Sequence, residues 1–253
     1  MITASFWRDR SVFVTGHTSA QGAWLALALE RLGAHVTGYG PDAADGAAIY
    51  DASDAGRSLC DVRADLDDTT LLDGALRASE ADIVVHLAER NAVNDGAILE
   101  AVNSAPFVQA ALLVAPERRA AGRKRARSET TGARLLSVYC PQPVGADAAA
   151  SNLHVLDCVY GFLLLAETAC RREGRIAGEW AFAEEGDALA LGWSPLLDAA
   201  EAQRWNDEWL RAAQSGADMA AFSRIQVEAY LAQRVRAASP LDPAHVEPMK
   251  AVA

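Results

Sequence analysis

Lysine is scarce in this chain. Its 253 residues include two lysines, Lys124 and Lys250, and the residues four places before them are Ala120 and Val246. A tyrosine one helical turn before a lysine is an effective general base, because the ammonium group favours the ionised phenol. The sequence therefore excludes any reaction that depends on a Tyr-x-x-x-Lys pair.

Long hydrophobic runs and excess positive charge are also missing. No apolar run approaches the roughly 20 residues of a membrane-spanning helix. Residues 1–8 lack the charged and apolar regions of a signal peptide. The net charge of −11 disfavours nucleic acid as a partner, because phosphates need a basic surface. We therefore expect a cytoplasmic protein with neither a membrane nor a nucleic-acid partner.

Cysteine is sparse, and its spacing shows no repeat. Such a pattern favours free thiols in a reducing cytoplasm over a disulfide framework. His154 and Cys158 stand four residues apart, but no second pair nearby completes a metal site, so we expect no bound metal. The motifs Gly-x-Ser-x-Gly, Walker A and His-Glu-x-x-His are absent as well. The cysteines are Cys60, Cys140, Cys158 and Cys170.

The opening of the chain has the order of a phosphate-binding βα unit, with an apolar strand, a glycine turn and an apolar-periodic helix. The turn contains Gly16, Ser19 and Gly22, where such turns prefer three glycines. The Cβ of Ser19 narrows the approach of a pyrophosphate, although its hydroxyl could donate to phosphate. His17, inside the turn, could orient a polar ligand group. NAD(P) binding is therefore possible but weakened, and we expect no cofactor to be required.

Predicted strands alternate with predicted helices over the first half of the chain. This alternation is typical of an α/β fold, and we expect a Rossmann-like domain over 1–150 with a doubly wound parallel sheet of about six strands. We expect 151–236 to form a reduced helical substrate region at the crevice mouth, in one structural unit with the domain, and 237–253 to be a loose tail. The predicted strands are 12–15, 35–40, 58–60, 83–87, 135–139 and 179–183, and the predicted helices are 23–32, 71–79, 97–115, 155–172, 198–213 and 218–236.

Segments along most of the chain match one known family in order. They are 6–7, 12–18, 22–25, 60–63, 84–88, 154–157, 161–167, 180–182, 191–195, 208–209, 216–219 and 226–230. They resemble the extended short-chain dehydrogenase/reductase superfamily, and especially a truncated CDP-glucose 4,6-dehydratase. The resemblance implies that, if a dinucleotide binds, Asp61 meets the adenine amine and Val62 packs on the adenine ring. The residues after Gly40 favour neither NAD nor NADP strongly.

The chain departs from that family where the family performs its chemistry. The family's fifth strand leads into a Thr/Ser-Asp-Lys/Glu cluster, but residues 137–141 contain neither a carboxylate nor a lysine. Only 142–153 separate this strand from the next helix, so the family's Tyr-x-x-x-Lys helix and much of its sugar pocket are missing. The family's arginine before the counterpart of 154–157 is absent too. We therefore expect no classical NAD-dependent sugar 4,6-dehydration.

Three polar residues are the candidates for catalysis at the carboxyl ends of two strands. Tyr139 ends what we predict to be a central strand, where a phenol could donate to a carbonyl or act as a general acid or base. Ordinary aromatic packing at a strand end is the alternative. Glu89 and Arg90 follow the fourth predicted strand, and Glu89 is the preferred general base over a solvated loop acid. Cys140 and His86 are interpreted as buried structural residues.

Three functional interpretations remain open. The residues favour a degenerate enzyme of this superfamily that catalyses a redox-neutral cyclisation, isomerisation or elimination on a small-molecule intermediate of specialised metabolism. The alternatives are a non-catalytic ligand-binding or partner protein and a residual NAD(P)-dependent sugar-nucleotide epimerase/dehydratase. The apolar helices predicted over 97–115 and 155–172 need cover, so we expect a homodimer.

Overall fold

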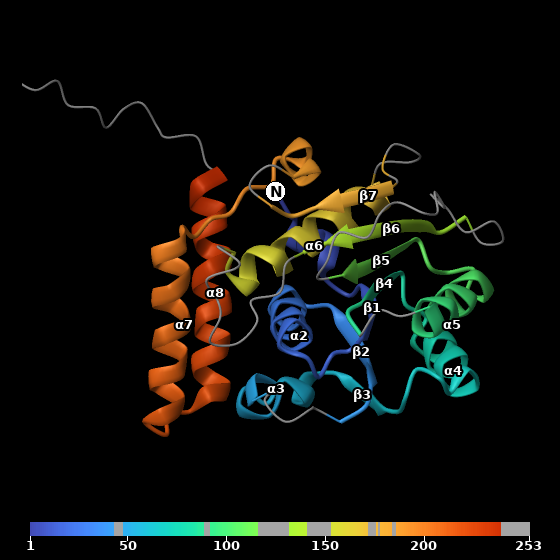
Figure 1. The fold of residues 1–253 in the computed structure, drawn as a ribbon, viewed down its shortest axis with the longest axis horizontal. Helices are drawn as coiled ribbons and strands as arrows, with labels where there is room; N and C mark the ends of the chain where they lie inside the picture. Colours follow the sequence, from blue (N-terminus) through green and yellow to red (C-terminus); the bar gives the residue numbers. More distant parts are fainter. Residues whose placement is uncertain are drawn as a thin grey trace, which may run out of the picture.

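A computed structural model describes residues 1–42, 48–88, 92–115, 132–140, 153–171, 176, 178–183 and 186–238. Its centre is a sheet of seven parallel strands in the order β3-β2-β1-β4-β5-β6-β7, with helices on both faces (Figure 1). This is the doubly wound, Rossmann-like α/β fold that the alternation predicted. The strands are β1 (Ser11–Thr15), β2 (His35–Gly40), β3 (Cys60–Arg63), β4 (Ile83–His86), β5 (Ala110–Ala115), β6 (Arg134–Tyr139) and β7 (Gly178–Ala181).

Helices connect the strands and cover the sheet. Those labelled α2 and α6 contribute to the apolar cluster on one face, and α4 and α5 contribute to the cluster on the other. Gly33 ends α2 with φ +80°, a left-handed conformation that favours glycine. The helices are α1 (Ala4–Trp7), α2 (Ala20–Leu32), α3 (Ala48–Ala52), α4 (Thr69–Ser79), α5 (Ala92–Ser104), α6 (Val155–Arg171), α7 (Ala199–Gln214) and α8 (Met219–Ala238), with short 3-10 helices η1 (Ala55–Ser58) and η3 (Asp187–Leu191).

The helix predicted over 97–115 is wrong in its second half. The helix α5 ends at Ser104, and Ala110–Ala115 forms β5, which pairs with β4 and β6. Every residue of β5 is buried, because neighbours cover both faces of this inner strand. A short apolar run of this kind has no period that separates a buried strand from a buried helix, so the pairing decided the outcome. The third strand also lies later than the predicted 58–60.

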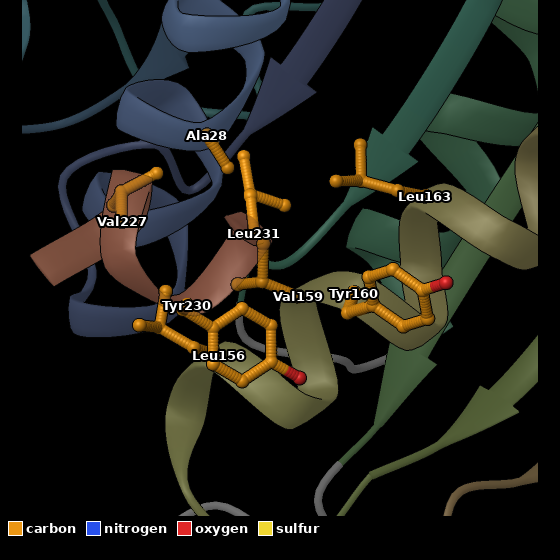
Figure 2. A pocket seen from close by; sticks show the side chains of 8 residues that line it. All are labelled: Ala28, Leu156, Val159, Tyr160, Leu163, Val227, Tyr230 and Leu231. Carbon is orange, nitrogen blue, oxygen red and sulfur yellow. The ribbon is translucent and has the colours of Figure 1, made fainter. Parts of the chain in front are cut away.

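The C-terminal helices α7 and α8 form an outer layer of the fold. The helix α8 packs along α2, which lies between it and the sheet (Figure 1). Figure 2 shows the apolar seam in which Val227, Tyr230 and Leu231 of α8 meet side chains of α2 and α6. The seam leaves no room for a water molecule. The apolar length of α6, which was expected to need a second subunit, is therefore covered by its own chain.

A buried ion pair fastens α8 to α6. The carboxylate of Asp157, in the first turn of α6, accepts hydrogen bonds from Arg234 Nη2 at 2.6 Å and from the Tyr230 hydroxyl at 2.7 Å. The Arg234 guanidinium also lies 4.2 Å from the ring centroid of Tyr160. Removing one partner of such a pair leaves an uncompensated buried charge, at a cost of about 3–5 kcal/mol. The outer layer is therefore held by polar contacts as well as by apolar packing.

The expectation of free thiols throughout is wrong for two of the cysteines. Cys140, directly after β6, forms a disulfide with Cys158 in the first turn of α6, and both residues are buried. The fold brings them to the same edge of the sheet, which irregular spacing in the sequence does not reveal. Cys60 and Cys170 are free. Cys158 is therefore not available as a metal ligand beside His154.

Among the described residues, no helix combines the length and the apolar character that crossing a membrane requires. Within the same ranges, no three His, Cys, Asp or Glu side chains gather closely enough to hold a metal ion.

We predict that the stability of the fold decreases as the pH falls from about 6.5 to about 4, in part through His154. Its imidazole lies beside the Trp205 ring, and Nδ1 accepts a hydrogen bond from the Leu156 N–H at 3.2 Å. Burial lowers the pKa of His154 from 6.5 to about 4. Because the folded-state pKa is depressed, this contribution is complete above pH 6.5 and is lost as the pH falls through 4.

A shift of this size corresponds to about 3 kcal/mol at most. Urea unfolding at a series of pH values between about 4 and 7 measures it. The variant His154→Gln should show a smaller change in the free energy of unfolding across that window. Equal pH slopes for the two proteins would contradict the assignment.

Candidate functional site

The turn after β1 packs directly on the segment that follows β4. Gly16 has φ +72°, and a Cβ at this position would lie 2.6 Å from the backbone nitrogen of Ala88. A Cβ on Gly22 would collide with the carbonyl oxygen of Gly16 and with Cα of His17. The two glycines therefore let the turn, the start of α2 and the end of β4 touch. Strand order reverses between β1 and β4, and doubly wound sheets bind their ligands at such a switch point.

Ser19, which stands where such turns prefer glycine, is the N-cap of α2. Its Oγ accepts a hydrogen bond from the Gly22 N–H at 3.1 Å. The hydroxyl proton can still donate to a ligand, because a serine oxygen accepts and donates at the same time. The N-terminus of α2 points to the same edge of the sheet and favours a negative group. Ser19 therefore caps α2 and still leaves the N-terminus of the helix able to attract an anion.

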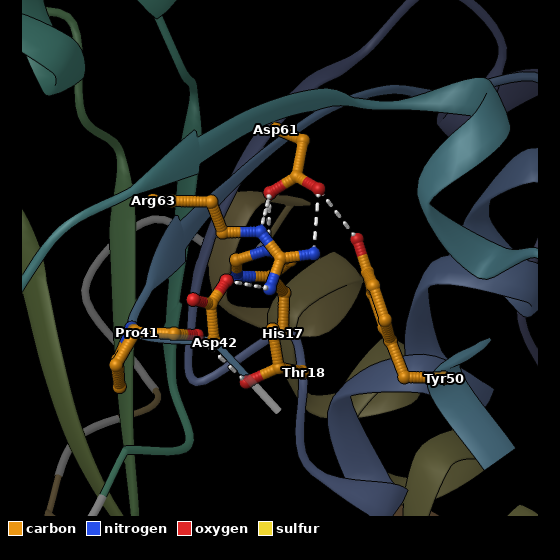
Figure 3. Close-up of polar contacts among 7 residues, drawn as sticks. All are labelled: His17, Thr18, Pro41, Asp42, Tyr50, Asp61 and Arg63. Atoms are coloured by element: carbon orange, nitrogen blue, oxygen red, sulfur yellow. Dashed lines mark hydrogen bonds and ion pairs between the residues drawn. The ribbon is translucent and has the colours of Figure 1, made fainter. Parts of the chain in front are cut away.

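Asp61, in β3, is the centre of a polar cluster beside this turn (Figure 3). Its Oδ1 accepts hydrogen bonds from His17 Nε2 at 2.8 Å and from Arg63 Nε at 2.7 Å. Its Oδ2 accepts from the Tyr50 hydroxyl at 2.9 Å and from Arg63 Nη2 at 2.8 Å. Burial acts to raise the pKa of Asp61, but the hydrogen bonds from Arg63, His17 and Tyr50 outweigh it and hold the pKa below its ordinary value. Asp61 is therefore an ionised carboxylate with two donors on each oxygen.

His17 lies beneath the turn, behind Asp61. Its side chain is fully buried, and its ring stands edge-on to the Tyr50 ring with the centroids 5.5 Å apart. Gly38 of β2 makes room for it, because a Cβ there would lie 2.5 Å from the imidazole. Burial lowers the pKa of His17, so the ring is neutral at pH 7 and donates through Nε2 to the ionised carboxylate. His17 can therefore orient a ligand group only through Asp61.

Two members of this cluster were not among the sequence candidates. Arg63 ends β3, and its Nη1 lies 3.4 Å from Asp42 Oδ1. Two residues apart on a strand, Asp61 and Arg63 share a face, and this spacing was a usable signal. Tyr50 comes from α3 after a loop rich in Gly, Ala and Asp, and no pattern in the sequence pointed to it. Burial raises the pKa of Tyr50 above its ordinary value, so its hydroxyl remains a donor at neutral pH.

Val62 and His86 occupy structural positions. Val62 alternates with Asp61 along β3 and packs against the apolar cluster beneath α4 and α5. Its contact with an adenine ring remains a prediction. His86 is fully buried in β4, where its Nδ1 lies 2.6 Å from Thr15 Oγ1, as expected for a core histidine.

Tyr139 ends β6, which is not the central strand that the sequence suggested. In the sheet β6 lies between β5 and β7, so two strand spacings of about 5 Å each separate it from β4. The side chain is half-buried and lies on the face opposite to Val138, which packs in the cluster with α2 and α6. Glu89 and Arg90 lie outside the described residues. The structure therefore brings Asp61 to the glycine turn but leaves Tyr139 apart from it. The catalytic roles of Tyr139, Glu89 and Arg90 remain predictions.

The chain is thus a Rossmann-like α/β protein with a glycine turn at the switch point of its sheet and a polar cluster around Asp61 beside that turn. Residues 12–103 match the model of the NAD dependent epimerase/dehydratase family. A CDP-glucose 4,6-dehydratase from Salmonella typhimurium (strain LT2) is 34% identical over 88 residues, which are 35% of this chain and 24% of that enzyme. The resemblance inferred from the sequence is confirmed in this N-terminal part. The match spans about a quarter of the length of that relative.

Two solved structures share the fold. UDP-glucose-4-epimerase from Stenotrophomonas maltophila, with bound NAD and formylated UDP-arabinopyranose, has a TM-score of 0.56 and 14% identity, and the match covers 82% of this chain and 100% of that chain. The enzyme WbmG from Bordetella bronchiseptica, in complex with NAD, has a TM-score of 0.54 and 14% identity, with 82% and 96% covered. At these identities the similarity establishes the fold alone.

We predict that Gly38→Ala destabilises the protein by about 1–3 kcal/mol, because the added methyl group forces the His17 ring away from Asp61. The matched control is Gly74→Ala, at an exposed position of α4 where a Cβ meets no atom within 4 Å. This control should be neutral or more stable by up to about 1 kcal/mol, as expected for alanine in a helix. Thermal and urea unfolding measure both variants. Equal stability of the two variants would show that His17 does not need the space.

Proposed function

We propose that this chain binds an adenine dinucleotide of the NAD(P) class at the Gly16 turn and catalyses a redox-neutral conversion of a small molecule. The observation that carries the proposal is the packing of Gly16 on Ala88 beside the N-terminus of α2. Rossmann-like domains hold a pyrophosphate in this setting. The family match over 12–103 and the NAD in two proteins of the same fold support this class of ligand.

Asp61 is the proposed acceptor for the adenine amine. An ionised carboxylate has about four lone-pair sites, and four donors already use those of Asp61. An adenine amine must therefore displace a donor. Arg63 is the donor best placed to leave, because its side chain is 33% exposed whereas His17 is fully buried. This competition supports binding that is weaker and more readily reversed than that of a tightly held cofactor.

The reaction is proposed to be redox-neutral because the chain has no Tyr-x-x-x-Lys pair to accept the hydroxyl proton during hydride transfer. A cyclisation, isomerisation or elimination needs proton transfer alone. Tyr139 and Glu89 are the proposed groups, and such catalysis is worth roughly 10²–10⁴-fold in rate. A role in specialised metabolism and a cytoplasmic location are proposed from the sequence arguments, whereas the argument for a homodimer no longer holds for α6, which its own chain covers.

A non-catalytic ligand-binding protein is the second candidate. The observation that favours it is the position of Tyr139, which lies two strands away from β4 and therefore away from the switch point. In that case the nucleotide would bind at the Gly16 turn without turnover. The two candidates share the binding step and differ in their dependence on Tyr139.

We predict that the wild-type protein binds NAD or NADP, and that Asp61→Asn weakens this binding by about tenfold or more. The substitution removes a charged acceptor, and hydrogen bonds to charged groups contribute about 1.5–3 kcal/mol. Isothermal titration calorimetry measures the Kd, and mass spectrometry of the purified protein detects any nucleotide carried over from expression. Asp73→Asn is the matched control, because Asp73 pairs with Arg77 on the surface of α4. Absence of binding by the wild-type protein would refute the proposed ligand.

We predict that Tyr139→Phe and Glu89→Gln each lower turnover by at least about tenfold, because each removes a group that transfers or donates a proton. Neither substitution should change the melting temperature, since both retain the size of the side chain. Turnover is to be measured on a substrate found by screening small biosynthetic intermediates, without added nicotinamide cofactor. Turnover that ignores both substitutions but follows bound NAD(P) would contradict this assignment.

A further inference from the structure

We propose that Arg224 of α8 is a positioning residue for the nucleotide site. It holds the turn between α3 and η1, and this turn places the Tyr50 hydroxyl on Asp61. The effect of Arg224 on ligand binding rests on the function proposed above.

Arg224 reaches from α8 past α2 to the end of α3. Its Nη1 donates to the Ser53 carbonyl oxygen at 2.9 Å, and its Nη2 donates to the Asp54 carbonyl oxygen at 3.4 Å. Its Nε donates to Glu30 Oε1, on α2, at 3.2 Å. An arginine can bind these groups together because its donors form a rigid planar fork. The guanidinium therefore joins α8, α2 and the turn after α3.

The turn that Arg224 binds contains a residue with a left-handed backbone conformation. Asp54 adopts φ +51°, a conformation that is uncommon for residues with a side chain, although aspartate adopts it more readily than most. Such a conformation persists when the surrounding structure determines it. Hydrogen bonds from one guanidinium to two successive carbonyl groups, those of Ser53 and Asp54, supply such a determinant.

The two elements joined by this turn enclose the Tyr50 hydroxyl. Tyr50 lies in α3 and is 4% exposed, and its hydroxyl donates to Asp61 Oδ2 at 2.9 Å. Gly56 lies in η1, and a Cβ there would come 2.6 Å from the same hydroxyl oxygen. The position of η1 relative to α3 therefore decides whether the hydroxyl can reach Asp61. Because the Ser53–Asp54 turn sets that position, Arg224 acts on Asp61 through Tyr50.

This connection would make α8, a C-terminal helix, a part of the proposed site. The helix α8 lies beyond residues 12–103, the part of the chain that matches the epimerase/dehydratase family. When a ligand displaces Arg63, His17 and Tyr50 are the donors that remain to orient the Asp61 carboxylate. Loss of Arg224 should therefore leave the acceptor less well oriented and weaken nucleotide binding.

The test compares Arg224→Met with Arg31→Met. Arg31 of α2 pairs with Glu228 of α8 at 3.1 Å on the surface, so this control breaks a contact between the same two helices without touching the turn. The first measurement needs no ligand and follows the Asp61 carboxyl group by carbon NMR across a pH titration. Arg224→Met and Tyr50→Phe should each raise the pKa of Asp61 because a donor is lost. Arg31→Met should leave this pKa unchanged.

The second measurement is the Kd for NAD or NADP in a double-mutant cycle. Arg224→Met should weaken binding about three- to tenfold, the effect of one hydrogen bond, and should have no further effect in the Tyr50→Phe background. An unchanged pKa of Asp61 in folded Arg224→Met protein overturns the inference, as do additive effects on the Kd. If the pKa shifts but the wild-type protein binds no nucleotide, the proposed function fails while the positioning role stands.

Discussion

The ionised carboxylate of Asp61 is the constraint on which the candidate site depends. A partly buried charge needs hydrogen-bond partners, and Asp61 draws them from three elements: the turn after β1, the helix α3 and its own strand. The requirement explains the glycines around it. Gly38 leaves space for the His17 ring, and Gly56 leaves space for the Tyr50 hydroxyl. The partners of the Asp61 carboxylate therefore account for the glycines at positions 38 and 56.

The glycine turn and the polar cluster around Asp61 form one continuous structure. Gly16 packs on the end of β4, and His17, the next residue, reaches beneath the turn to Asp61. Ser19 caps α2 and keeps the positive end of the helix at the same edge of the sheet. These features carry the proposal that a pyrophosphate and an adenine bind here. They do not provide the base that would accept the hydroxyl proton during hydride transfer, because the chain contains no lysine preceded by a tyrosine at the required spacing.

The second half of the chain stabilises the first more than it extends the site. The Asp157–Arg234 pair and the apolar seam attach α8 to α6 and α2, and the Cys140–Cys158 disulfide attaches the end of β6 to the start of α6. Arg224 is the exception that we propose, since it extends from this outer layer to the turn behind Tyr50. In this proposal α8 acts on the candidate site through the backbone of α3 and η1.

The amino-acid sequence by itself determined the parallel α/β fold, the glycine turn with Gly16 and Gly22, and the absence of a tyrosine–lysine base. These features depend on local periodicity and on residue identity, which a sequence displays directly. The tertiary structure alone decided that residues 110–115 form a strand, that Cys140 meets Cys158, and that Tyr139 lies beyond the central strands. It also brought Tyr50 to Asp61, and Arg224 to the turn between α3 and η1. Each of these outcomes depends on contacts between residues far apart in the chain, and no spacing along the sequence encodes such contacts.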